Sequence, residues 1–417
     1  MDAPPALHAF AGYGIELEYM IVDRETLSIM PIADTLLRAA GGNGADVDRG
    51  RFGWSNEIVL HLVELKNTRP APALEPLAAG FQAEVGAINQ ALHPLGARLM
   101  PGGMHPWMSP ASDTRIWPHD HAPIYRAYDR IFGCGQHGQA NLQSMHLNLP
   151  FANDAEFARL HAAARLLLPI LPALAASSPI ADAAPGGYLD ARMKAYSTAV
   201  RRVPPVIGQL IPDTIRSRAE YEERILAPMY RAIAPLDPEG VLQYEWLNAR
   251  GAIPRFERDA LEIRVIDAQE CPRADLAIAA AGTAVIRALY DDKWSSLAMQ
   301  QAFGTDALVK ILHACIRDAD QAVIDDAGYL RLLGLSDRHY RAGELWRHLI
   351  TRIGLNRSTF WAGTLHVMLE HGPLARRILR SLGSDHSSAR LQDVYRGLCD
   401  CLETGCMFGE DQAWPGA

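Results

Sequence analysis

The 417-residue chain lacks the long apolar runs of a membrane protein. A spanning helix needs about 20 consecutive apolar residues, and the apolar stretch Leu166–Ala176 is shorter and contains prolines. The N-terminus has no basic region followed by an apolar core, so no signal peptide is expected. We therefore expect a cytoplasmic protein that does not attach to a membrane.

Cysteine is scarce, and basic residues are outnumbered by acidic ones. There are six cysteines, of which three stand isolated, as in reduced cytosolic proteins. The other three, Cys399, Cys401 and Cys406, lack the spacing and the following histidine of a zinc site, so we interpret them as inert thiols. The formal net charge of −8 argues against a general nucleic-acid binder.

What is present is a globular composition, 49% hydrophobic and 21% charged, which excludes a disordered chain. Strand patterns fall in the first two-thirds and helical patterns dominate the last third, which indicates an α+β fold. The predicted strands are Gly14–Asp23, Glu57–Lys66, Gln143–Leu149, Leu242–Leu247 and Ala260–Asp267. The main predicted helices are Leu74–Leu95, Asp154–Ser177, Arg218–Tyr230, Ala274–Tyr290, Ala307–Asp326, Tyr340–Ile353, Leu374–Leu382 and Leu391–Leu402. We expect Pro101–Gln139 to form long ordered loops with short helical pieces, and Gly186–Arg202 to be a loop.

Four of the predicted strands carry charged or polar side chains on one face and apolar side chains on the other. The polar positions are Glu16 and Glu18, then Glu64 and Lys66, then His146 and Asn148, and finally Glu262 and Arg264. An antiparallel sheet often turns one polar face to water, and this explains any single strand. As a set, however, several carboxylates on one face repel each other and require cations beside them.

These side chains suit a site for a nucleotide and divalent metal ions. Oxygen ligands favour Mg²⁺, which commonly bridges nucleotide phosphates. The imidazole of His146 is also compatible with binding of Mn²⁺. Arg264 is two residues from Glu262 and would point into the same space, where a guanidinium can bind a phosphate oxygen bidentately. The chain has no Gly-x-x-x-x-Gly-Lys-Ser/Thr segment. The residues therefore suggest ATP-dependent chemistry without a P-loop.

Five motifs, in the same chain order, resemble those of the type 2 glutamate–cysteine ligases, also called carboxylate–amine ligases. The motifs are Gly14-Ile-Glu-Leu-Glu-Tyr19, Glu64-Leu-Lys66, Met145-His-Leu-Asn148, Ser177-Ser-Pro179 with Gly187-Tyr-Leu-Asp-Ala-Arg192, and Leu261-Glu-Ile-Arg-Val-Ile-Asp-Ala268. The sequence departs from the family pattern at Asn148, where many members carry a second histidine.

The resemblance implies a glutamine-synthetase-like fold, in which a curved antiparallel sheet has helices on its outer face. It implies an ADP-forming ligase that joins a carboxylate to an amine through an acyl phosphate, with a γ-glutamyl-type amide as product. By matching position, Glu16, Glu18, Glu64, His146 and Glu262 would be metal ligands. Arg264, Lys66 and Asn148 would bind ATP, and Arg264 and Arg192 would act on the phosphate or the substrate carboxylate.

The remaining expectations concern domains and substrates. We expect a catalytic domain over residues 1–295 and a helical extension over 296–417, packed on that domain or forming a homo-oligomer contact. The substrates would be a small carboxylate and an amine, with amino acids favoured. The candidate residues of the substrate pocket are Met104, Trp107, Trp117, Tyr125 and Tyr188. The candidate general bases are His105, His119, His121 and His137. Glu57 is a candidate further metal ligand if a bulge lets it share the face of Glu64.

Two other functions fit the same polar face. A phosphotransferase of the guanidine-kinase type would yield ADP and a stable phosphorylated acceptor without a new amide. A non-catalytic nucleotide-binding protein would bind ATP without turnover, although the intact set of carboxylates weighs against this alternative.

Overall fold

The computed structural model describes residues 6–42, 46–336 and 339–409. At its centre is an eight-stranded sheet in the order β2-β3-β4-β1-β6-β10-β9, with β5 paired to the end of β1, and all of its pairings are antiparallel. Its strands are β1 (Gly14–Asp23), β2 (Asp46–Asp48), β3 (Phe52–Asn56), β4 (Leu62–Asn67), β5 (Ala97–Met100), β6 (Ser144–Pro150), β9 (Ala252–Arg255) and β10 (Ala260–Asp267). Two small sheets pair β7 (Ile180–Ala181) with β8 (Ala184–Pro185) and β11 (Val323–Ile324) with β12 (Tyr340–Arg341).

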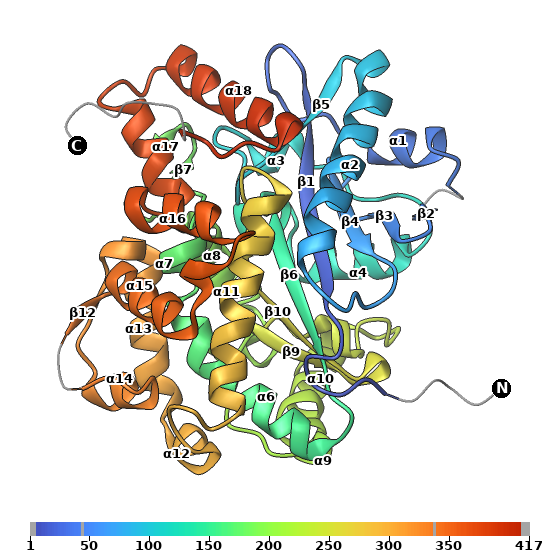
Figure 1. Cartoon of the computed structure of the whole chain (residues 1–417). Helices are drawn as coiled ribbons and strands as arrows, with labels where there is room; N and C mark the ends of the chain where they lie inside the picture. The colour runs from blue at the N-terminus through green and yellow to red at the C-terminus, as the bar shows by residue number, and fades with distance from the viewer. Residues whose placement is uncertain (1–5, 43–45, 337–338, 410–417) are drawn as a thin grey trace.

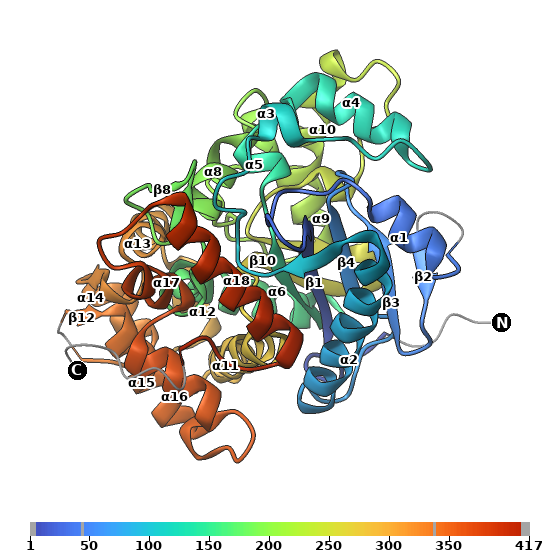
Figure 2. The same ribbon diagram turned by 90° about the horizontal axis from the view of Figure 1, so that it is seen from above.

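Helices cover both faces of the central sheet. Seen from above, β1, β4 and β10 lie between α2 and α11 on one side and α3, α4 and α5 on the other (Figure 2). The first helices are α1 (Ala33–Ala39), α2 (Glu75–Leu92), α3 (Pro110–Asp113), α4 (Ala122–Phe132), α5 (His137–Ala140), α6 (Asp154–Leu167), α7 (Pro172–Ala175), α8 (Ala191–Ala199), α9 (Arg218–Tyr221) and α10 (Ala227–Ile233). The later helices are α11 (Pro272–Tyr290), α12 (Leu297–Ala302), α13 (Thr305–Asp318), α14 (Ala327–Leu332), α15 (Ala342–Ile353), α16 (Ala362–His371), α17 (Leu374–Leu382) and α18 (Ser388–Thr404), and they gather on one side of the molecule (Figure 1).

The main core lies between the apolar face of the sheet and α2, α6 and α11. The alternate residues Ile15, Leu17 and Tyr19 of β1 are buried there. Burying apolar side chains of this size contributes about 1.5–3 kcal/mol each, which fixes the strand register because a one-residue slip would turn them to the opposite face. None of the helices in the described segments combines the length and the apolar composition that crossing a bilayer requires.

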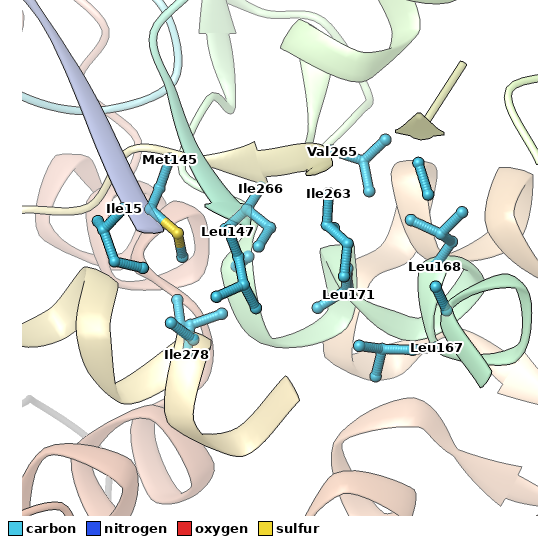
Figure 3. Packing of buried hydrophobic residues seen from close by; sticks show 14 of the residues in the cluster. Ile15, Met145, Leu147, Leu167, Leu168, Leu171, Ile263, Val265, Ile266 and Ile278 are labelled. Atoms are coloured by element: carbon cyan, nitrogen blue, oxygen red, sulfur yellow. The ribbon is translucent and has the colours of Figure 1, made fainter. Parts of the chain in front are cut away.

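A β-bulge interrupts β10 beside β6. Ile263 pairs with Leu147 and Ile266 pairs with Met145, so two residues of β10, Arg264 and Val265, lie opposite the single residue His146. Val265 and Ile266 therefore both enter the core, in the same cluster as Leu171 and Ile278 (Figure 3). The bulge keeps Arg264 on the opposite, polar face.

The predicted α+β fold with an antiparallel sheet and outer helices is confirmed, whereas several element boundaries were wrong. The predicted strand Leu242–Leu247 does not form, and its last three residues, Glu245–Leu247, make a 3₁₀ turn. The predicted loop Gly186–Arg202 contains α8, which Asp190 caps by accepting a hydrogen bond from the Met193 N–H at 2.8 Å. The predicted strand Glu57–Lys66 begins only at Leu62, and β3 and β9 were missed.

A buried ion pair ties the C-terminal helices to the central sheet. Arg377 on α17 pairs with Glu270, which follows β10 by three residues, and both side chains are fully buried. Arg377 Nη1 also donates to the Phe408 carbonyl at 2.9 Å. This pairing agrees with an extension packed on the catalytic domain, while a division at residue 295 stays a prediction.

Replacing Arg377 with methionine is expected to destabilise the protein by about 3–5 kcal/mol, because Glu270 would be left as an uncompensated buried charge. The free energy of unfolding from urea titration measures this loss. A matched double variant, Arg377→Met with Glu270→Gln, should recover part of it. A loss below about 1 kcal/mol in the single variant would contradict the assigned importance of the pair.

Candidate active site

The strand register brings the predicted polar residues together on one face. Glu18 of β1 lies directly opposite Glu64 of β4. Glu16 of β1 lies opposite Lys66 of β4 on one side and opposite His146 of β6 on the other. Asn148 lies opposite Glu262. Strands β4, β1, β6 and β10 are adjacent in the sheet, so four segments far apart in the sequence supply one continuous polar surface.

The centre of this surface is a cluster of Glu16, His146 and Glu262. His146 Nδ1 donates to Glu16 Oε2 at 2.8 Å and lies 3.9 Å from Glu262 Oε1. One ligand atom from each of the three residues lies within 4.8 Å of the others, which is the spacing of a group able to hold a metal ion. The donors are two carboxylates and one imidazole, a set that suits Mg²⁺ or Mn²⁺.

Electrostatic interactions in this cluster are strong. Burial alone would lower the pKa of His146, but the hydrogen bond to Glu16 and the charges of Glu18, Glu16 and Glu262 outweigh it and raise the pKa above its ordinary value. Burial would raise the pKa of Glu16, yet the hydrogen bond from His146 holds it below the ordinary value. Without a metal ion, these interactions favour the protonated imidazolium, whose positive charge lies among the carboxylates.

A second acidic group lies beside the first. Glu18 and Glu64 are only 7% and 8% exposed, although like charges directly opposite each other destabilise a sheet. Glu18 Oε2 accepts hydrogen bonds from the Ser144 N–H at 2.6 Å and from its hydroxyl at 2.5 Å. Glu64 Oε1 accepts from Ser55 Oγ at 2.8 Å and from Lys66 Nζ at 3.0 Å. These contacts use Glu18 Oε2 and Glu64 Oε1, so the other oxygen of each carboxylate could face a cation.

Glu57 joins this acidic group by a route that the sequence interpretation missed. It needs no bulge, because it follows the end of β3, two residues after Ser55, and Ser55 pairs with Glu64 across the hairpin. Burial and the charge of Glu64 raise the pKa of Glu57 well above its ordinary value. A cation placed between Glu57 and Glu64 would therefore be attracted by both carboxylates.

Two arginines hold the outer carboxylate of the cluster. Arg264 Nε lies 3.1 Å from Glu262 Oε1, and Arg255 Nε lies 3.0 Å from Glu262 Oε2. The predicted convergence of Arg264 and Glu262 is thus confirmed. Arg255 was not predicted, although the turn between β9 and β10 pairs it with Ala260 and so places it on the same face as Glu262.

Arg192 is buried, with only 3% of its surface exposed. Its Nη1 is 3.3 Å from Asp267 Oδ1, and its Nη2 donates to the Arg264 carbonyl at 3.1 Å. Its contact with a phosphate or a substrate carboxylate stays a prediction. Lys66 is bound to Glu64, and Asn148 Nδ2 lies 3.3 Å from Glu16 Oε1, so both remain at the edge of the cluster.

The loop residues are mostly engaged in packing. His105 is buried, donates Nε2–H to the Leu27 carbonyl at 2.8 Å, and burial lowers its pKa to about 4. Trp117 and Met104 are also buried. Tyr125 differs, because Asn56 Nδ2 donates to its hydroxyl at 3.2 Å, next to Glu57. The general-base role of the loop histidines and the pocket role of the aromatic residues stay predictions.

Comparison with known proteins identifies the family. A model of glutamate–cysteine ligase family 2 matches residues 13–327, which include all the predicted site residues. The chain belongs to this family. The predicted family and enzyme class are thereby confirmed, and the chain is an ATP-dependent carboxylate–amine ligase.

Individual relatives extend the match. An uncharacterized protein of Archaeoglobus fulgidus is 32% identical over 391 residues, covering 94% of this chain and 98% of that protein. A Rubrobacter xylanophilus protein with the provisional name glutamate–cysteine ligase 2-3 is 26% identical over 267 residues, covering 64% of this chain and 66% of its own. The Francisella tularensis glutamate–cysteine ligase, solved in complex with AMP, has the same fold at a TM-score of 0.61 and 12% identity, covering 97% of this chain and 90% of that chain.

Proposed function

We propose that this ligase activates a small amino-acid carboxylate with ATP and joins it to an amine, forming a γ-glutamyl-type amide through an acyl phosphate. The observation that carries the proposal is the Glu16–His146–Glu262 cluster, whose ligand atoms lie within 4.8 Å of one another beside Arg255 and Arg264. Family membership supports ATP as the nucleotide.

In this proposal the carboxylates and His146 bind cations, and the basic side chains bind phosphate. Glu16, His146 and Glu262 would hold one divalent cation, and Glu18, Glu64 and Glu57 would hold a second. Bound Mg²⁺ would neutralise charge on the phosphate oxygens. The Nε atoms of Arg264 and Arg255 lie 3.1 and 3.0 Å from the Glu262 oxygens, and Arg264 Nη1 donates to the Asn248 carbonyl. The remaining guanidinium nitrogens would bind the γ-phosphate. Lys66 and Asn148, at the edge of the cluster, would complete the ATP contacts.

The reaction follows from this placement. A carboxylate oxygen of the acid attacks the γ-phosphorus, and the bond from this phosphorus to the oxygen of ADP breaks. The amine nitrogen then attacks the acyl carbon, inorganic phosphate leaves, and the amine loses a proton. Cations around the phosphoryl group stabilise the charge that spreads over its oxygens in the transition state.

The proposal predicts ADP and phosphate release that depends on both an acid and an amine. A panel of amino acids and amines with ATP and Mg²⁺ is expected to reveal one such pair, with the amide identified by mass spectrometry. With an ¹⁸O-labelled carboxylate, one label should appear in the released phosphate. A phosphorylated acceptor without an amide would instead indicate the phosphotransferase, and no release by folded protein across the panel would refute the proposal.

A further inference from the structure

Two aspartates meet where β10 ends and α8 begins. Asp267 ends β10 and is fully buried, and Asp190, the N-cap of α8, lies within hydrogen-bonding reach of it. Asp267 Oδ2 accepts from the Ser177 N–H at 2.9 Å and from the Ser178 hydroxyl at 2.7 Å, while Oδ1 faces Arg192 Nη1 at 3.3 Å. Asp267 thus has donors at both oxygens, including one cation.

Asp190 is in a different position. Its Oδ1 accepts from the Met193 N–H at 2.8 Å, but its Oδ2 is buried and has no donor among residues 6–42, 46–336 and 339–409. A buried charged oxygen without a donor is costly. Burial and the charge of Asp267 raise the pKa of Asp190 well above its ordinary value. The donor-free Oδ2 and the raised pKa both favour a protonated Asp190 whose proton is shared toward Asp267.

Arg192 connects this pair to the bulge in β10. The Arg264 N–H donates to the Gly251 carbonyl at 3.1 Å, and the Arg264 carbonyl, which lies where the pairing with β6 is interrupted, accepts from Arg192 Nη2 at 3.1 Å. The backbone N–H and carbonyl of Arg264 are thus both hydrogen-bonded to residues outside β6. A shift of Arg192 would release the carbonyl and move the base of the Arg264 side chain.

We propose that Asp267, supported by a hydrogen bond from Asp190, is a positioning residue that fixes Arg192 and, through it, the bulge from which Arg264 reaches the nucleotide phosphates. The inference rests on the proposed function, to which the phosphate role of Arg264 belongs. It requires a negative charge at position 267 and only a hydrogen-bond donor at position 190.

Two isosteric substitutions separate these requirements. Asp190→Asn keeps an acceptor for the Met193 N–H and a donor toward Asp267, whereas Asp267→Asn removes the charge beside Arg192 and turns one acceptor into a donor. We expect Asp267→Asn to lower kcat/KM for ATP about a hundredfold more than Asp190→Asn does, the loss typical of a misplacement near 1 Å. Asp190→Leu, which has no donor, should behave like Asp267→Asn.

The control is Asp237→Asn, which changes a buried aspartate that binds the Leu242 N–H at 2.8 Å outside this network. Thermal unfolding midpoints and calorimetric ATP affinity are measured for all four variants and the wild type. Equal losses in Asp190→Asn and Asp267→Asn, or losses that follow only the unfolding midpoints, would overturn the inference. If the wild type binds ATP without amine-dependent ADP release, the proposed function fails while the ranking of ATP affinities still tests the inference; a wild type that does not bind ATP overturns both.

Discussion

Replacing Arg264 with alanine is expected to lower the rate of ADP formation by about three orders of magnitude, the lower range for an arginine that stabilises a phosphoryl transition state. The loss corresponds to about 4 kcal/mol. Arg264 is positioned for this role because its Nε lies 3.1 Å from Glu262 Oε1 and its Nη1 donates to the Asn248 carbonyl at 3.1 Å, two contacts that restrain the guanidinium beside the cluster. The initial rate of ADP release at saturating ATP measures the effect.

Arg258 provides a matched control, since it lies in the β9–β10 turn that precedes the strand of Arg264 and its side chain is 62% exposed. Arg258→Ala should retain the wild-type rate. Arg264→Lys keeps one positive charge without the planar fork, so an intermediate loss is expected. If Arg264→Ala keeps most of its turnover while remaining folded, the assignment of the phosphate site is wrong.

The sequence pattern predicted the polar face correctly where a strand is regular and pairs over its whole length. In β1 and β6 the two-residue alternation places Glu16, Glu18 and His146 on one side, and the buried apolar positions between them fix that register. The apolar side chains also located the core, because burial of one face is the dominant constraint on such strands.

The prediction failed where long-range pairing determines the position of a residue. Arg255 lies on a four-residue strand that contains a proline and has no clear alternation, so only its pairing with β10 reveals its orientation. The bulge at Arg264 and Val265 breaks the period of β10 and depends on the partner strand. Helix α8 has no continuous apolar stripe, which explains why its segment was predicted to be a loop.

These features, which the sequence did not predict, all lie around Glu262 and Arg264. Arg255, the bulge and the N-cap of α8 all surround Glu262 or the backbone that carries Arg264. Alternation identified the side chains that would bind cations and phosphate, while the groups that orient them come from irregular backbone. Such orientation by short strands and bulges is common beside active sites.

Replacing Glu16 with glutamine is expected to raise the Mg²⁺ concentration needed for half-maximal activity at least about a hundredfold. Partners that merely orient a metal ligand already cost 10–100-fold in affinity or activity when they are lost, so the loss of a proposed ligand should be no smaller. Glutamine keeps the size of the side chain but loses the charge that faces His146. Titration of ADP release with Mg²⁺, and separately with Mn²⁺, measures this change.

A second measurement tests the same site without turnover. Binding of a metal ion to the folded state alone raises the unfolding temperature, so Mg²⁺ with an ATP analogue should stabilise the wild type relative to EDTA. Glu16→Gln should lose most of this increase, whereas Glu257→Gln, an exposed carboxylate in the β9–β10 turn, should retain it. In EDTA the Glu16→Gln protein should remain folded, because the substitution removes one of several repelling buried carboxylates. An unchanged Mg²⁺ requirement together with an unchanged thermal shift would place the metal elsewhere on the polar face, and the pairing of Glu18 with Glu64 would then become the first site to test.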